Sequence, residues 1–352
     1  MARINKQIIL NEFVVGRPKP NNFKLVEVSV PELQPGEILI KALYFNLDGY
    51  MERLMRERKA YPYSNISNVK IGEVIHGSSV GIVEQSNNPD FKEGDMVVAY
   101  TGWQEYAILK GNLITALPWA YEDVKKVSGV VKPSYYLGSV GMTGLTAYAG
   151  ISEVGHAKAG ETVVTSASIG AVSSIFGQMA KLKGCRVVGM AGTDDKCKFI
   201  TEELGFDECV NYKNASFIED LQAATPQKID IYFDTVGGPI FNTVLPLLNE
   251  RARALLCGSM GWLNYTEPEM PMAPDITALM HFSRMPRRFT IQAFLVFDYM
   301  DKYDEFLKET IPLIQSGQLK VLEDVTKGIE NAPEGFIKML QGKHFGKPVV
   351  EL

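Results

Sequence analysis

The residues best suited to bind a ligand lie near the middle of the chain. A turn of mostly small side chains, 168–170, joins a predicted strand to a predicted helix there. The run before it, 161–167, is short and apolar like a buried strand, and the run after it, 171–183, has hydrophobic residues at helical spacing. A helix that starts after such a turn presents backbone N–H groups and the positive end of its dipole. This arrangement suits a pyrophosphate, although a purely structural turn is an equal alternative.

The glycine positions of the usual dinucleotide-binding pattern fall here on Ala167, Gly170 and Ser173. Taken alone, this match is weak. The third position mainly lets the helix pack closely on the strand, and serine is only slightly larger than alanine. Its hydroxyl group can also donate a hydrogen bond to a phosphate. We therefore interpret Ser173 as a tolerated variant of the pattern.

The end of the next predicted strand, 186–192, indicates which nicotinamide cofactor fits. A site for NAD usually has an acidic residue there, bound to the ribose 2′-hydroxyl group. Here the strand ends in Ala191 and Gly192, which leave room for a 2′-phosphate. Lys196 can supply the countercharge, and Tyr212 can offer its hydroxyl group or its ring face. The alternative is that Lys196 is a solvated residue of a first helical turn, with Asp194 as the helix N-cap.

The pattern of the sequence changes near residue 129. Residues 1–128 contain short β-branched and aromatic runs separated by Gly, Pro, Asn and Asp, which predicts a compact β-barrel-like domain. From 129 to 309 apolar strands alternate with helical patterns, which predicts a parallel sheet with crossover helices. We expect residues 310–352 to return to the first domain as a terminal helix and strand.

Composition excludes several classes of partner. The 352 residues carry a net charge of −5 without a block of like charges, which argues against binding to nucleic acid or to an anionic membrane surface. No apolar run reaches the ~18 residues of a membrane span, and the N-terminus lacks the apolar core of a signal peptide. We therefore expect a cytoplasmic protein.

Eight motifs, in this order, make the chain similar to one enzyme superfamily. They are LDGYMERLM, GWQEYAIL, GMTGLTAYAGISEVG, SASIGAVSSIFGQMAKLKGCRVVGMAGTDDK, GFDECVNYK, FDTVGGPIFNTVLPLL, QAFLVFDY and GIENAPEGFIKMLQGKHFGK. The chain resembles the medium-chain dehydrogenase/reductases, and within them the zinc-independent branch of prostaglandin, alkenal and curcumin reductases. The similarity covers nearly the whole length.

The resemblance implies an α/β fold, with a GroES-like β-barrel domain and a Rossmann domain built on a doubly wound parallel sheet. It implies NADPH as the cofactor, an active site in the cleft between the domains, and a homodimer joined through the last strand of the Rossmann sheet. By match to the family motifs, cofactor contacts are expected at Asn46, Met142, Thr146, Gly170, Ala171, Val172, Ser173, Lys196, Tyr212, Thr235, Cys257, Ser259, Leu263, Phe294, Leu295, Val296 and His344.

Several positions depart from the branch. Proline is usual where Gly49 and Thr143 stand, and arginine where Glu52 stands. The loop after the fifth strand has Leu263 in place of a tyrosine, and His344 replaces an asparagine. These positions fall at or near the presumed cleft, so the resemblance supports the cofactor more firmly than the substrate.

The sequence also predicts that no metal takes part. Zinc enzymes of the same superfamily bind the metal with cysteine and histidine, beginning soon after an early strand. Here the first cysteine is Cys185, and no two histidines stand at ligand spacing. His76 is the one tempting candidate, and a lone histidine is more often structural.

A hydride donor without a metal suits reduction of a carbon–carbon double bond activated by a carbonyl group. Hydride would add to the β-carbon, and a hydroxyl group would stabilise the enolate oxygen. Tyr50 is our first candidate for this donor, with a core aromatic as its alternative role, and Tyr265 is the second candidate. An NADPH:quinone oxidoreductase and a non-catalytic NADPH-binding protein remain alternative functions. The expected partner is thus a small enone, alkenal or quinone.

Overall fold

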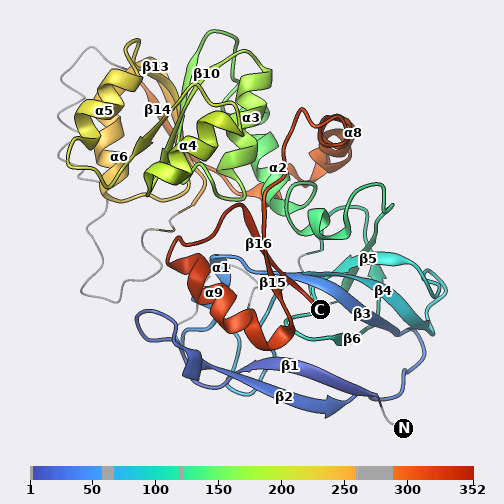
Figure 1. Ribbon diagram of the computed structural model, residues 1–352. Coiled ribbons are helices and arrows are strands. Elements are labelled where there is room, and N and C mark those ends of the chain that lie inside the picture. The colour runs from blue at the N-terminus through green and yellow to red at the C-terminus, as the bar shows by residue number, and fades with distance from the viewer. Residues whose placement is uncertain (1–2, 58–66, 119, 121, 259, 261–287) are drawn as a thin grey trace. The chain divides into compact units, whose positions relative to one another are not determined.

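The structure is a computed structural model that describes residues 3–57, 67–118, 120, 122–258, 260 and 288–352 (Figure 1). It divides into two compact units, Met1–Met142 with Glu323–Leu352, and Thr143–Leu322. The domain limits expected from the sequence, 1–128 with 310–352 and 129–309, stay a prediction.

The second unit is built on a parallel sheet of six strands in the order β11-β10-β9-β12-β13-β14. The strands are β9 (Thr162–Thr165), β10 (Arg186–Ala191), β11 (Glu208–Asn211), β12 (Ile229–Asp234), β13 (Leu248–Leu256) and β14 (Thr290–Ala293). Their central members are almost continuously apolar because helices cover a parallel sheet on both faces. β14 occupies one edge and is largely exposed, as the expected homodimer would require, although the dimer itself stays a prediction.

The helices of this unit connect the strands and bury its core. They are α2 (Met142–Ala149), α3 (Ser173–Leu182), α4 (Asp194–Glu202), α5 (Phe217–Ala224), α6 (Pro239–Val244) and α8 (Tyr303–Gln315). Helix α3 can pack closely on the segment that precedes β11 because Gly177 has no side chain: a Cβ atom there would lie 1.9 Å from the ring of Phe206. On the same helix, Phe176 stacks on Phe233 of β12 with ring centroids 3.9 Å apart.

The first unit is mainly antiparallel. Its larger sheet has the order β15-β16-β3-β4-β5-β8-β7, with β6 paired to β3, and β1 and β2 form a separate pair. The strands are β1 (Ile4–Leu10), β2 (Phe23–Ser29), β3 (Ile38–Asn46), β4 (Ser79–Ser86), β5 (Met96–Ala99), β6 (Tyr106–Leu109), β7 (Asn112–Leu113), β8 (Asp123–Lys126), β15 (Glu323–Lys327) and β16 (Lys347–Glu351); the helices are α1 (Tyr50–Leu54) and α9 (Ala332–Leu340). Trp103 is fully buried at the centre of the core, stacked between Phe23 and Phe45.

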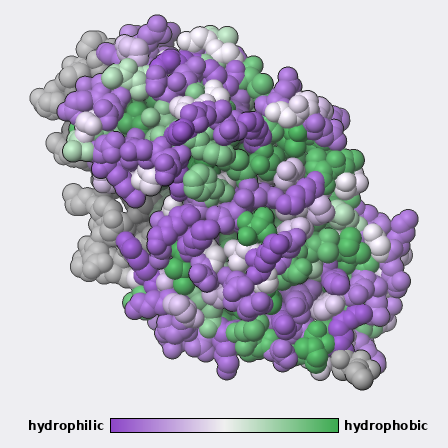
Figure 2. All heavy atoms as spheres, viewed as in Figure 1, coloured by the Kyte–Doolittle hydropathy of each residue, from purple (hydrophilic) through white to green (hydrophobic). Residues whose placement is uncertain are grey.

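Hydrophilic residues cover most of the face shown in Figure 2. Among the described residues, no helix combines the length and the apolar character needed to cross a membrane.

His76 is a buried residue of the first unit, only 6% exposed, with its ring edge-on to Tyr100 at 5.9 Å. Burial lowers the pKa of His76 to about 4, because the charged imidazolium loses its hydration, and the nearby carboxylate of Glu73 only partly opposes this shift. The histidine is therefore neutral at neutral pH. These contacts agree with the structural role that the sequence favoured.

The low pKa of His76 predicts a dependence of stability on pH. In the unfolded chain the group takes up a proton below about pH 6.5, whereas the folded chain resists protonation down to about pH 4. The unfolded state thus binds more protons in this window, so stability is lost as the pH falls through it, by an amount on the order of 3 kcal/mol. Urea denaturation across the window should show this loss in the native protein and a smaller loss in His76→Gln. The exposed His156 provides the control, His156→Asn. Equal pH profiles for the native protein and His76→Gln would contradict the assignment.

Candidate functional site

The order of the parallel sheet defines a switch point at its carboxyl edge, where doubly wound sheets place a ligand crevice. The chain runs outward from β9 through β10 to β11, then returns to the other side of β9 with β12. Helices that follow β9 and β12 therefore leave in opposite directions, and ligands of doubly wound sheets bind where this happens. The residues that follow these two strands, 166–170 and Thr235, are the first candidates for a site.

The turn after β9 holds a strained backbone. Ala167 has φ of +46°, a left-handed conformation that costs a residue with a Cβ atom roughly 1–2 kcal/mol. Gly170 donates its N–H to the carbonyl oxygen of Ala167 at 2.8 Å, and a Cβ atom on Gly170 would lie 3.0 Å from that oxygen. A larger residue at position 170 would therefore make a tight contact with this carbonyl group. This close approach explains the one glycine of the pattern that the sequence keeps.

The side chain of Ser168 holds the turn in place through hydrogen bonds to two strands. It is fully buried, and its Oγ donates to the carbonyl oxygen of Thr165 at 2.8 Å and accepts from the backbone N–H of Met190 at 2.7 Å. The anchor therefore ties the turn to both β9 and β10. Sequence reasoning missed this residue, since a serine in a turn carries no signal of its own.

The start of α3 presents backbone donors that no other described residue engages. No hydrogen bond to another described residue engages the N–H groups of Ala171, Val172 or Ser173. The first N–H groups of a helix need an outside acceptor, and the helix dipole makes an anion the favoured one. The expected phosphate contacts at Gly170 to Ser173 therefore lie on one continuous cradle. The side chain of Ser173 turns inward, where its Oγ lies 3.5 Å from Oγ1 of Thr235.

Asp234 organises the other side of the crevice. It is fully buried, and its Oδ1 accepts from Oγ of Ser166 at 2.9 Å and from the backbone N–H groups of Val236 and Gly237 at 2.9 and 3.0 Å. Oγ of Ser166 in turn accepts from the N–H of Thr235 at 2.8 Å. Asp234 thereby joins the ends of β9 and β12 and fixes Thr235. Asp234 was not among the residues expected from the sequence, although its place at the end of a strand was a usable signal.

The end of β13 joins the same network through its backbone. The N–H of Cys257 donates to the carbonyl oxygen of Asp234 at 2.8 Å. Burial and the neighbouring Asp234 carboxylate raise the pKa of the Cys257 thiol to about 12, so this cysteine stays neutral. Cys257 therefore places a small, uncharged side chain beside this network.

Lys196 lies at the end of β10, in the first turn of α4. The N-cap of α4 is Thr193, whose Oγ1 accepts from the N–H of Lys196 at 3.3 Å. Asp194 instead accepts from Nδ2 of Asn211 at 2.8 Å. Lys196 is only 8% exposed. The sequence left open that Asp194 is the N-cap and that Lys196 is solvated. Both of these alternatives are wrong, because Thr193 is the N-cap and Lys196 is buried.

Tyr212 and Lys213 close this part of the site. A Cβ atom on Gly192 would lie 2.9 Å from the hydroxyl oxygen of Tyr212 and 3.2 Å from Cε of Lys213. Nζ of Lys213 lies 5.9 Å from the centroid of the Tyr212 ring. Burial raises the pKa of Tyr212, which keeps its hydroxyl group protonated and able to donate. The ends of β10 and β11 therefore bring Gly192, the phenol of Tyr212 and Lys213 together, and Lys213 was not among the residues expected from the sequence.

The residues expected from the first unit are held by a separate polar group. Asn46 is buried at the end of β3, where its Oδ1 accepts from the N–H of Ser78 at 2.8 Å and its Nδ2 donates to Oδ2 of Asp48 at 2.5 Å. Lys347 is 3% exposed and forms an ion pair with Asp48. This pair fixes the carboxylate that orients Asn46. The pairing was invisible in the sequence because the two partners are far apart along the chain.

Tyr50 begins α1 and is half-buried against the hydrophobic core of the first unit. Glu52, one of the departures from the branch, is completely buried and forms an ion pair with Arg56. Burial raises the pKa of Glu52, and the hydrogen bond from Arg56 opposes that shift. Met142 and His344 are also half-buried in this unit.

The remaining expected residues lie outside these clusters. Thr146 is buried in α2, and Phe294 is buried beside Phe233 with ring centroids 6.4 Å apart. Leu295 is 64% exposed, and Val296 begins the short helix that follows β14. Ser259, Leu263 and Tyr265 fall outside the described residues.

The described residues contain no group of three or more His, Cys, Asp or Glu side chains placed to hold a metal ion. The expectation that no metal takes part stays a prediction.

Two family models match the chain, one described as the N-terminal domain of oxidoreductase over residues 6–117 and one as zinc-binding dehydrogenase over residues 171–308. The chain is 39% identical to NADPH-dependent curcumin reductase of Escherichia coli (strain K12), over 99% of this chain and 97% of the relative. It is 36% identical to the NADP⁺-dependent 2-alkenal reductase of Nicotiana tabacum, over 98% and 97% of the two chains.

A solved structure is similar to this chain over nearly its whole length. The crystal structure of CurA from Vibrio vulnificus in complex with NADPH is similar with a TM-score of 0.88 and 40% identity, over 98% of each chain. The likeness confirms the expected fold class, an α/β fold with a GroES-like barrel domain and a Rossmann domain.

Proposed function

Because this chain belongs to the medium-chain dehydrogenase/reductases, in the branch of curcumin and alkenal reductases, we propose that it reduces the carbon–carbon double bond of α,β-unsaturated ketones or aldehydes. It is an NADPH-dependent oxidoreductase. The observation that carries the proposal is the end of β10, where an NAD site would have an acid: Gly192 lies there against the hydroxyl group of Tyr212, and Lys196 follows, buried in the first turn of α4.

The described residues fit this cofactor at both of its phosphate positions. The unused N–H groups of Ala171, Val172 and Ser173 suit the pyrophosphate. Lys196, with Lys213 and the hydroxyl group of Tyr212, suits the 2′-phosphate, because a charge-assisted hydrogen bond is stronger than a neutral one. When bound, NADPH supplies a hydride to the β-carbon of the substrate.

On the substrate side, the protein has to stabilise negative charge that develops on the carbonyl oxygen. We assign this role to the hydroxyl group of Tyr50, which can donate a hydrogen bond to that oxygen. One such donor lowers the barrier by about 3–4 kcal/mol when it is oriented in advance. The packing of Tyr50 against the core of the first unit limits its side-chain rotation and supports this assignment. Tyr265 remains the second candidate.

The reaction can be tested with an acyclic enone. Incubation with NADPH should consume absorbance at about 340 nm and yield the saturated ketone, because hydride adds to the β-carbon. Product analysis by mass spectrometry and NMR identifies the carbon that is reduced. An allylic alcohol as product would contradict the proposed reaction. Faster turnover of quinones than of any enone would instead favour a quinone oxidoreductase, and binding of NADPH without any turnover would favour a non-catalytic role.

Lys196→Ala should weaken NADPH binding while leaving NADH binding nearly unchanged. The variant loses one charge-assisted hydrogen bond of about 1.5–3 kcal/mol to the 2′-phosphate, which corresponds to roughly a 10- to 100-fold higher Kd. Fluorescence titration with each cofactor measures the two effects. Lys198→Ala is the matched control, since Lys198 lies on the same helix with an exposed side chain. A parallel loss of NADPH and NADH affinity in Lys196→Ala would show that the lysine is structural.

Tyr50→Phe should lower kcat by roughly 100-fold with an enone and leave the Kd for NADPH within about twofold, since the hydroxyl group acts only on the developing oxyanion. Steady-state kinetics and cofactor titration separate the two effects. Tyr44→Phe is the control within the same unit, because it removes a phenol that bonds to Glu351 at 2.9 Å. Unchanged turnover in Tyr50→Phe would remove this residue from the mechanism.

A further inference from the structure

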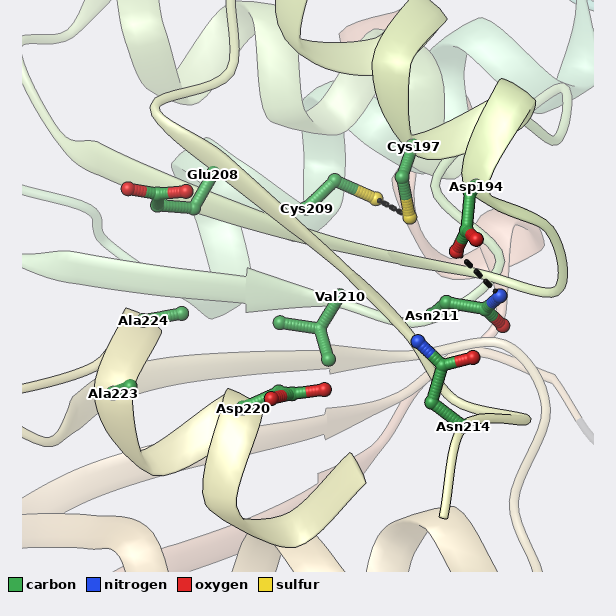
Figure 3. A pocket seen from close by; sticks show the side chains of 10 residues that line it. All are labelled: Asp194, Cys197, Glu208, Cys209, Val210, Asn211, Asn214, Asp220, Ala223 and Ala224. Atoms are coloured by element: carbon green, nitrogen blue, oxygen red, sulfur yellow. Dashed lines mark hydrogen bonds between the residues drawn. The ribbon is translucent and has the colours of Figure 1, made fainter. Parts of the chain in front are cut away.

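Two of the four cysteines face one another at the edge of the parallel sheet. Cys197 comes from α4 and Cys209 from the edge strand β11, and their sulfur atoms are 2.6 Å apart (Figure 3). The other two are separate: Sγ of Cys185 bonds to the carbonyl oxygen of Lys158 at 3.3 Å, and Cys257 follows β13. All four are free thiols. Thus one pair alone, among the described cysteines, is placed for mutual chemistry.

The hydrogen bond within the pair makes the two thiols unequal. Sγ of Cys209 donates to Sγ of Cys197. This bond lowers the pKa of Cys197, although burial of the sulfur opposes the shift. The same bond, together with burial, raises the pKa of Cys209. The thiolate is the reactive form of cysteine, so Cys197 has the character of a nucleophile and Cys209 holds the proton.

A small oxidant can reach both sulfurs. The pair lies in an open pocket of about 350 Å³, which Asp194, Glu208, Asn211 and Ala224 also line (Figure 3). In the figure the two sulfur atoms point toward each other from the helix and the strand, and the bond between Asp194 and Asn211 lies nearby. Hydrogen peroxide is small enough to enter such a space.

We propose that Cys197 and Cys209 are a redox modification site that a hydroperoxide converts from a dithiol to a disulfide. The Cys197 thiolate attacks one peroxide oxygen, the O–O bond breaks, and the products are a sulfenic acid on Cys197 and hydroxide, which takes up a proton as water. The sulfur of Cys209 then attacks the sulfenic sulfur, the S–O bond breaks, and the departing hydroxide takes the Cys209 proton as a second water. The two thiols lose two electrons, and the peroxide gains them.

The geometry favours closure of the bond without a change of fold. A disulfide holds its sulfur atoms about 2.05 Å apart, so the pair needs to approach by only roughly half an ångström. The bond would tie α4 directly to β11. Lys196 immediately precedes Cys197, and Tyr212 immediately follows β11, so the modification would lock together the two elements that form the expected 2′-phosphate site.

Peptide mapping tests the site directly. The reduced protein is treated with hydrogen peroxide, its remaining thiols are alkylated, and it is digested with trypsin without reductant. The expected product joins the dipeptide 197–198 to the peptide 199–213, with the mass of two hydrogen atoms missing, and dithiothreitol should separate the two. The melting temperature should rise by several degrees on oxidation, because the link restricts the unfolded chain, and should return on reduction.

Matched variants assign the roles of the two sulfurs. Cys185→Ser and Cys257→Ser should keep the linked peptide, whereas Cys197→Ser and Cys209→Ser should lose it. In Cys209→Ser the sulfenic acid on Cys197 should persist and react with dimedone. In Cys197→Ser the remaining Cys209 should form no dimedone adduct. Four alkylated cysteines in the oxidised native protein, or a link through Cys185 or Cys257, would overturn the proposal. None of these measurements uses NADPH or an enone, so their outcome is independent of the proposed activity.

Discussion

The proposed cofactor site depends most on a set of backbone donors that find no acceptor among the described residues. The N–H groups at the start of α3 face a turn in which Ala167 is held in a left-handed conformation. Such a conformation persists only where the surroundings over-determine it. Ser168 ties the turn to β10, and Asp234 ties the end of β9 to that of β12. Both anchors are fully buried, so the donors are held in place before any ligand arrives.

The proposed site divides cofactor recognition between two places. In this proposal the start of α3 would bind any pyrophosphate, because it consists of backbone groups and small side chains. Discrimination would rest instead on the ends of β10 and β11, where Lys196 is buried and Tyr212 lies against Gly192. A charge pair is stronger in such a shielded place than on an open surface. The unphosphorylated cofactor would bind the first place and gain little at the second.

Local patterns were enough to predict the tight turn after β9 and the parallel sheet, while the cofactor contacts of Lys196 and Tyr212 stay a prediction. The turn and the sheet each follow from the periodicity of one strand or helix and from the rule that parallel strands end at a common edge. The anchors were not predictable in this way. Asp48 and Lys347 form an ion pair between distant segments of the chain, and Ser166 meets Asp234 across two strands. Periodicity says that such positions are buried, but it does not say which buried polar group faces which.

The N-cap of α4 could not be predicted from the sequence for a different reason. Thr193 and Asp194 are both good N-cap residues, and their order in the sequence does not decide between them. The choice falls to Thr193 because Asn211, at the end of the neighbouring strand, binds the carboxylate of Asp194. A tertiary contact thus sets the start of the helix, and with it the position of Lys196 in the first turn.

The departures from the branch near Tyr50 can be understood in the same physical terms. Gly49 has φ of −60°, which is the value that a proline ring would impose, so the backbone keeps this conformation without the ring. Neighbouring contacts supply part of the restraint: the ion pair of Lys347 with Asp48 holds the preceding residue, and the N–H of Met51 donates to the carbonyl oxygen of Asp48 at 3.1 Å. Tyr50 can therefore keep its place although the proline is gone. Glu52 turns inward to Arg56. In this chain the phenol of Tyr50 lies at the start of α1, where the proposed chemistry needs it, and these contacts hold the residues around it.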